Sequence, residues 1–300
     1  SDTGLSWADA KTDLQDALDM APAGVEIWVA ECTYRPSEPA GRDATFLLED
    51  GVELFGGFPT GGGDGTFEAR DPLMYETILS GDLGTAGDTS DNAYHVVTVA
   101  PDATAAALLD GFTITGGNAD GSGATGAGGG IYNANGDPSL RRLVIRRNRA
   151  AFGGGMGNDG GEPTLTAVIF AGNVAGDDGG GLDTVGGVVR ITSAIFVGNQ
   201  ADDGGALSAI SGAIVELANT TLVGNSANRG VMYTSNGTLD AVNTILWGNT
   251  GAATYSAGGP IAVTGSIVEG GCPAGVTCTG VTSEDPRLYV APSAGDDATW

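Results

Sequence analysis

The chain has little of what a helical or membrane-spanning protein needs. Only 6% of its 300 residues are aromatic and only 16% are charged. No run reaches the roughly 18 consecutive apolar residues of a membrane span, so we expect none. The start at Ser1 has neither the charged nor the apolar region of a signal peptide, so an exported form would be a mature chain.

Basic residues are especially scarce, with 12 Lys and Arg against 37 Asp and Glu and a formal net charge of −25. A surface this acidic repels polyanions, which argues against nucleic acid as a partner. It also attracts divalent cations, so Ca²⁺ is the cofactor to consider. The alternative is that the acids only keep the chain soluble in a salty medium.

Cysteine and histidine are almost absent, with 3 and 1 residues respectively. Cys272 and Cys278 bracket a short, turn-rich loop, and a disulfide there would contribute roughly 2 kcal/mol on the chain-entropy model. Cys32 is far away in sequence and is expected to be a small buried residue. With His95 as the one histidine, zinc and a Ser-His-Asp triad are not credible. A disulfide and acidity favour a secreted, extracellular or cell-surface location.

Glycine and apolar residues are plentiful. Gly accounts for 53 residues, yet hydrophobic residues still make up 41%. Enough apolar side chains therefore remain to bury a core, and the composition is typical of many short strands joined by tight turns.

An asparagine marker, preceded by glycine in its four later copies, recurs along the chain with steps of 25, 26, 26 and 24 residues. Its asparagines are Asn148, Asn173, Asn199, Asn225 and Asn249. The segments between them carry β-branched residues and are cut by glycine, which favours three short strands per repeat over a pair of helices. The sequence therefore predicts an all-β fold, a single-stranded right-handed parallel β-helix of about 25 residues per coil.

Alignment on the asparagines predicts which side chains point inward. The inward stack, three positions earlier, is Ile145, Phe170, Phe196, Leu222 and Leu246. The outward column, two positions earlier, is Arg146, Ala171, Val197, Val223 and Trp247. We expect the asparagines themselves to form a structural hydrogen-bonded ladder inside a turn.

Four regions follow from this pattern. Residues 1–24 are expected to form an N-terminal cap, with a helix over 6–18 and Ser6 as its N-cap. Residues 25–109 form irregular first coils with a looped insertion at 59–71, and residues 110–270 form regular coils. Residues 271–300 form the disulfide loop and tail.

Several short motifs resemble those of bacterial secreted proteins with right-handed β-helix repeats. They are similar to the polymorphic outer-membrane protein repeats of chlamydiae and to pectate-lyase-like β-solenoids. The matching stretches are Trp7-Ala8-Asp9-Ala10, Ile27-Trp28-Val29-Ala30, Tyr94-His95-Val96-Val97, Asp110-Gly111-Phe112-Thr113-Ile114 and the Gly-Asn copies. The resemblance implies this fold and a secreted or surface location. It implies no single activity, since the same scaffold carries lyases, glycosidases and adhesins.

Two pairs of consecutive aspartates lie one coil apart. Asp177 and Asp178 precede Asp202 and Asp203 by 25 residues, so we expect the pairs to stack. Three interpretations stay open: solvated turn residues, a Ca²⁺ site, or a catalytic pair formed by Asp178 and Asp203, which would need acids about 5 to 9.5 Å apart.

Five arginines crowd into one coil. Arg141, Arg146 and Arg147 are the candidates for contact with an anion or an acidic sugar, beside Arg142 and Arg149. The alternative is a solvated face that offsets neighbouring acids.

The favoured function is a non-enzymatic surface scaffold for adhesion or self-assembly. We expect homo-association through the helix ends, including the edge at 288–290, or through an apolar side strip formed by Ala171, Val197, Val223 and Trp247. The alternative is a polysaccharide-active β-helix, either a lyase or a glycoside hydrolase, or a glycan-binding module.

Overall fold

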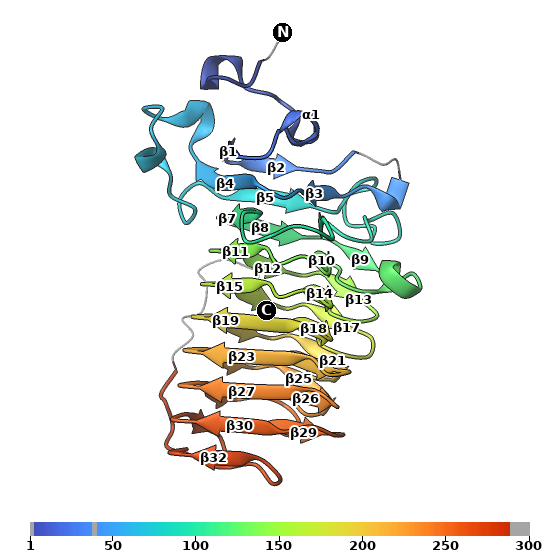
Figure 1. The fold of residues 1–300 in the computed structure, drawn as a ribbon, viewed down its shortest axis with the longest axis vertical. Coiled ribbons are helices and arrows are strands. Elements are labelled where there is room, and N and C mark those ends of the chain that lie inside the picture. Colours follow the sequence, from blue (N-terminus) through green and yellow to red (C-terminus); the bar gives the residue numbers. More distant parts are fainter. Residues whose placement is uncertain (1–2, 38–40, 289–300) are drawn as a thin grey trace.

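The computed structural model describes residues 3–37 and 41–288, and these wind into a right-handed parallel β-helix (Figure 1). Four sheets of ten, nine, eight and five strands run along the helix. Every ladder between named strands is parallel, and Ile169 pairs with Ile195, which lies one coil of 26 residues further on. Crossovers between parallel strands are right-handed as a rule. The predicted fold class is confirmed.

We call the sheets A to D. Sheet A contains β1 (Val25–Ala30), β4 (Val52–Phe58), β7 (Leu108–Asp110), β11 (Ser139–Arg141), β15 (Thr164–Thr166), β19 (Val188–Thr192), β23 (Ile214–Ala218), β27 (Thr238–Val242), β30 (Ile261–Thr264) and β32 (Thr277–Thr279). Sheet B contains β2 (Cys32–Tyr34), β5 (Thr77–Ser80), β8 (Phe112–Thr115), β12 (Val144–Arg146), β16 (Ile169–Ala171), β20 (Ile195–Val197), β24 (Thr221–Val223), β28 (Ile245–Trp247) and β31 (Ile267–Val268).

Sheet C contains β3 (Phe46–Leu48), β6 (Val97–Val99), β10 (Ile131–Ala134), β14 (Met156–Asp159), β18 (Leu182–Val185), β22 (Leu207–Ile210), β26 (Met232–Ser235) and β29 (Thr254–Ser256). Sheet D contains β9 (Asn118–Ala119), β13 (Arg149–Ala150), β17 (Val174–Ala175), β21 (Gln200–Asp203) and β25 (Ser226–Arg229). A regular coil passes through the sheets in the order A, B, D, C.

The core is a column of stacked side chains inside the coils. The five residues of the inward stack are all at most 1% exposed. Phe170 and Phe196 stack with ring centroids 4.6 Å apart. Each coil thus covers the apolar surface of its neighbours, and this burial is the main driving force for the fold.

The asparagines form a ladder in the turn between sheets B and D. Asn173 Nδ2 donates to Asn199 Oδ1 at 3.0 Å and to the carbonyl oxygen of Ile145 at 2.8 Å. The backbone N–H of Asn173 also donates to Asn199 Oδ1, at 3.0 Å. The same pattern links Asn148 to Asn173, Asn199 to Asn225, and Asn225 to Asn249. Four of the five side chains are fully buried, and Asn249, in the last rung, is half-buried.

The turn between sheets A and B holds one residue in the left-handed region in each regular coil. These residues are Arg142, Ala167, Ser193, Asn219 and Asn243, with φ between 48° and 58°. Glycine usually occupies such positions, so the sequence did not reveal them.

The N-terminal cap differs from the predicted helix over 6–18. A 3₁₀ turn, η1 (Trp7–Asp9), is followed by α1 (Leu14–Met20), whose N-cap is Asp13 rather than Ser6. Asp13 Oδ1 accepts a hydrogen bond from Gln15 N at 2.8 Å. The break arises because Trp7 packs against Phe58, with ring centroids 5.4 Å apart. Its ring fills the space where a Cβ of Gly62 would lie.

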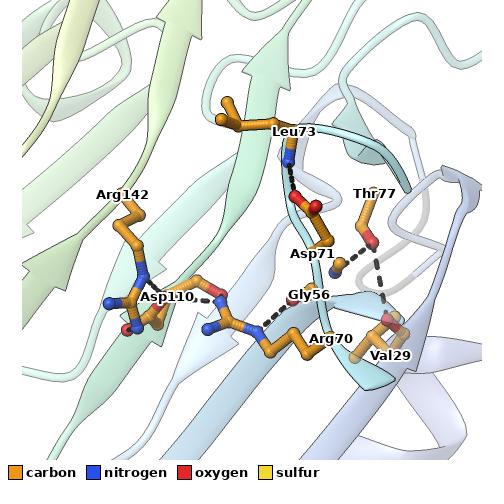
Figure 2. Close-up of polar contacts among 9 residues, drawn as sticks. Val29, Gly56, Arg70, Asp71, Leu73, Thr77, Asp110 and Arg142 are labelled. Atoms are coloured by element: carbon orange, nitrogen blue, oxygen red, sulfur yellow. Dashed lines mark hydrogen bonds and ion pairs between the residues drawn. The ribbon is translucent and has the colours of Figure 1, made fainter. Parts of the chain in front are cut away.

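The insertion carries two 3₁₀ turns, η3 (Thr60–Gly62) and η4 (Phe67–Ala69). Further 3₁₀ turns are η2 (Gly41–Asp43) and η5 (Gly123–Gly126). Figure 2 shows how the insertion is fastened: Asp110 accepts hydrogen bonds from both Arg70 and Arg142, and Arg70 Nε also donates to the Gly56 carbonyl oxygen at 2.5 Å. Asp110 is 1% exposed, so two guanidinium groups compensate its buried charge.

Two further features concern cysteine and the membrane. Cys272 and Cys278 form a disulfide, whereas Cys32 is exposed, so its predicted burial is wrong. Cys32 begins β2, at the outer edge strand of sheet B, and has a covering strand on one side only. Among the described residues, no helix has the length and apolar character to cross a bilayer.

Candidate functional site

Three aspartates from consecutive coils meet where sheet D turns toward sheet C. Carboxylate oxygens of Asp177, Asp178 and Asp203 all lie within 4.8 Å of one another. Asp203 ends β21, and Asp178 pairs with it in an isolated parallel bridge. Stacking of coils therefore brings together carboxylates that are one repeat apart in sequence. We call these three residues the aspartate cluster.

Two further side chains shape this site. Asp183, on the outward side of β18, is 4% exposed and accepts a hydrogen bond from Ser208 Oγ at 2.5 Å. Arg229, at the end of β25, places its Nε 2.6 Å from Asp203 Oδ1. The guanidinium is half-exposed, while the Asp203 side chain is almost fully buried.

The pKa values of three carboxyl groups at the site are raised. Burial raises the pKa of Asp178 to about 7, and repulsion from Asp183 and from the rest of the cluster adds to the effect. Burial also raises the pKa of Asp183 to about 6, against the opposing effect of the Ser208 hydrogen bond. The pKa of Asp203 is raised by burial as well, although Arg229 opposes this.

The spacing favours a cation over hydrolysis by the cluster itself. Two oxygens that share one Ca²⁺ at 2.3–2.6 Å lie at most about 5 Å apart, which the cluster satisfies. The acids of glycoside hydrolases stand about 5 to 9.5 Å apart, so the oxygens of the cluster, which lie within 4.8 Å of one another, are at the short end of that range. Asp178 Oδ1 is buried without a hydrogen-bond donor among the described residues, so it is a ligand atom with no competing partner.

The fourth predicted ligand does not join the cluster. Asp202 accepts a hydrogen bond from Asn228 Nδ2 of the next coil. Since consecutive side chains of a strand point to opposite faces, Asp202 is directed away when Asp203 faces the cluster.

The predicted anion-binding arginines lie on two sheets and in one turn of the same coil. Arg141 lies on sheet A and is exposed, whereas Arg146 lies on sheet B, where it pairs with Glu76 at 3.2 Å. Arg147 sits in the turn before Asn148 with a φ of 55°.

Sequence reasoning missed Asp183 and Arg229. Strand β18 pairs in register with β14 and β22, which aligns Asp183 with Gly157 and Ser208. Arg229 follows Asp203 by one coil and pairs with it in register. Extending the coil spacing forward from Asp203 finds Arg229. Asp183 lies on β18, the strand that follows Asp178 in the same coil, so the spacing does not find it.

A second surface stands out on sheet B. The paired strands β12, β16, β20, β24 and β28 point ten side chains outward, of which eight are apolar and none is acidic. They are Val144, Arg146, Ile169, Ala171, Ile195, Val197, Thr221, Val223, Ile245 and Trp247. Ala171, predicted to be an exposed part of this strip, is only 8% exposed, whereas Ile195 reaches 40%. We call these ten residues the sheet B face.

Comparison with known proteins gives little beyond the fold. No family model and no curated protein matches the chain. Among solved structures, the deglycosylated pectin methylesterase of Aspergillus niger is similar over 91% of this chain and 77% of its own, with 13% identity and a TM-score of 0.45. At that identity and TM-score the likeness carries no argument about activity, and the fold rests on the strand ladders described above.

Proposed function

We propose that the chain is a non-enzymatic extracellular scaffold that associates with a second copy of itself through the sheet B face. One observation carries the proposal: eight of the ten outward side chains of this face are apolar. An outward sheet face in contact only with water is normally polar, as the exposed Thr164, Thr166 and Arg190 of sheet A illustrate. Contiguous exposed apolar surface marks a contact site.

Charge favours the sheet B face as the place where two copies meet. Two chains that each carry a net charge of −25 repel one another over most of their surfaces. The sheet B face has no carboxylate among its ten side chains, so two copies meet there with the least repulsion. Five strands at about 4.8 Å spacing give a strip only about 20 Å long. We therefore expect a small interface and weak, concentration-dependent association.

Sedimentation velocity over a range of concentrations tests this function. Ile195→Glu adds a charge in the middle of the face and should weaken self-association at least about tenfold, because burial of an unpaired charge costs more than ~1.4 kcal/mol. Thr192→Glu adds the same charge on exposed sheet A and should associate like the wild type. A wild-type chain that stays monomeric at every concentration, or equal effects of both variants, would overturn the proposal.

A polysaccharide-binding or polysaccharide-cleaving role at the aspartate cluster is the second candidate. It is favoured by a carboxyl group whose pKa is about 7, which can give or take a proton near neutral pH. The half-exposed guanidinium of Arg229 pairs with Asp203, the neighbouring member of the cluster. In a screen of neutral and acidic polysaccharides, any binding or cleavage should be lost in Asp178→Asn and Asp203→Asn but retained in Asp202→Asn. A blank screen would count against this role.

A further inference from the structure

A loop of the early coils, residues 82–92, holds a second set of oxygen atoms. It leaves sheet B after β5 and is closed at its neck by a hydrogen bond from Ala93 N to the Gly81 carbonyl oxygen at 2.8 Å. Asn118 Nδ2, from the next coil, donates to the Thr89 carbonyl oxygen at 2.9 Å and holds the far arm. The loop is therefore fixed to the body of the β-helix at two points.

Three side-chain oxygens of this loop are buried and accept no hydrogen bond. They are Asp82 Oδ1, Asp91 Oδ1 and Asn92 Oδ1. Only seven such atoms occur among the described residues, so three of them fall within one loop. Asn92 as a whole is 5% exposed. A buried acceptor without a donor costs about 1–3 kcal/mol, and more when it is charged, so each requires a partner such as an ion or a water molecule.

The two carboxylates converge on the same short turn. Asp82 Oδ2 accepts a hydrogen bond from Gly87 N at 3.4 Å, and Asp91 Oδ2 accepts one from Thr85 N at 2.7 Å. Thr85 and Gly87 belong to one tight turn, closed by Asp88 N to the Thr85 carbonyl oxygen at 2.9 Å. The Oδ2 atoms are thus occupied by the backbone of the loop, while both Oδ1 atoms are left without a donor.

Neighbouring arginines do not neutralise these carboxylates. Arg35 Nε donates to the backbone carbonyl oxygen of Asp82 at 2.6 Å, and Arg42 Nε donates to that of Asn92 at 2.7 Å. Among the described residues, neither Asp82 nor Asp91 forms an ion pair. Two negative charges and a buried amide oxygen therefore share a fixed loop, and no cationic side chain of the described residues pairs with them.

We propose that the loop 82–92 binds a divalent cation of the Ca²⁺ type, with Asp82, Asp91 and Asn92 supplying side-chain oxygens. Carboxylate and amide oxygens are hard donors of the kind that Ca²⁺ takes, and water and backbone carbonyls complete its six to eight ligands. A cation held in the loop would offer a partner to these orphan oxygens. This site lies in the early coils and is separate from the aspartate cluster and from the sheet B face.

Calorimetric titration of the chelator-stripped protein with CaCl₂ tests the proposal. The Asp82→Asn/Asp91→Asn double variant keeps acceptors for the Gly87 and Thr85 N–H groups but removes both charges. It should lose one bound Ca²⁺ per chain, or bind it at least about tenfold more weakly. Asp88→Asn is the matched control, since its exposed carboxylate accepts hydrogen bonds only from Ser90 among the described residues. It should bind Ca²⁺ like the wild type.

The same titration in an Asp178→Asn/Asp203→Asn background separates this site from the aspartate cluster. A double variant in the loop that titrates like the wild type in both backgrounds would overturn the proposal. Hydrogen–deuterium exchange of the wild-type chain gives a second test that needs no variant. Ca²⁺ should slow exchange in peptides that cover 82–93, and unchanged exchange there would also overturn it.

Discussion

Asp178 shows how the stacking of coils changes an ordinary turn residue. In a turn on its own, an aspartate titrates near pH 3.9. Here burial raises its pKa to about 7, and repulsion from Asp183, Asp177 and Asp203 of the neighbouring coil adds to the effect. The 25-residue spacing predicted this meeting of the two aspartate pairs. It could not predict that Asp202 turns away, because that depends on which residue of the pair faces outward on β21.

The raised pKa predicts a pH-dependent stability in the absence of divalent cations. Between about pH 4 and pH 7 the folded state holds a proton on Asp178 that the unfolded state has released, so stability should fall as pH rises through this window. Asp178→Asn should flatten that fall and be the more stable protein at pH 8. Urea unfolding of both proteins from pH 4.5 to 8, in the presence of a chelator, measures the free energy of unfolding at each pH.

Asp202→Asn is the control for that experiment, since it removes a carboxylate one coil away that lies outside the cluster. Its pH profile should follow the wild type. Parallel profiles for the wild type and Asp178→Asn would show that Asp178 titrates normally in the folded state.

At the scale of elements, the features predicted best were those that recur in every coil. The inward stack and the asparagine column recur at a fixed spacing, so each coil repeats the same information. Features that depend on one tertiary contact were predicted poorly. The helix over 6–18 is broken because Trp7 packs on Phe58, and the left-handed position at Ala167 carries no glycine to mark it.

Substitution of an asparagine should destabilise the protein most in the middle of the ladder. Asn199→Ala would remove the acceptor of Asn173 N and one of the two acceptors of Asn173 Nδ2. It would also remove the side-chain donor to the Phe170 carbonyl oxygen. With each orphaned group costing about 1–3 kcal/mol, we expect a loss of roughly 3 kcal/mol or more in the free energy of unfolding.

Asn249→Ala provides the comparison at the end of the ladder. Asn249 is half-buried, so water can replace some of the hydrogen bonds that its side chain forms. We expect a loss of about 1 kcal/mol there. Guanidinium chloride unfolding of both variants gives the two values, and equal losses would contradict a ladder whose strength depends on burial.

At the scale of the whole molecule, charge and apolar surface are separated around the β-helix. Aspartates gather where sheet D turns toward sheet C and in the loop 82–92, while the sheet B face carries none among its ten side chains. The chain therefore has one side suited to cations and another suited to apolar contact. Composition alone predicted acidity and apolar strands, but their placement on different faces depends on which side of each strand points outward.

This separation predicts how self-association responds to salt. Raising NaCl from 0.1 to 1 M shortens the screening length from about 10 to 3 Å, which weakens the repulsion between two copies of net charge −25. The burial of apolar surface at the sheet B face does not depend on this charge repulsion. Sedimentation should therefore show stronger association at 1 M NaCl. A contact made by ion pairs, between the exposed Arg141 and Arg147 of one copy and acidic turns of another, would instead weaken as salt rises. The sign of the salt dependence therefore decides which surface joins the copies.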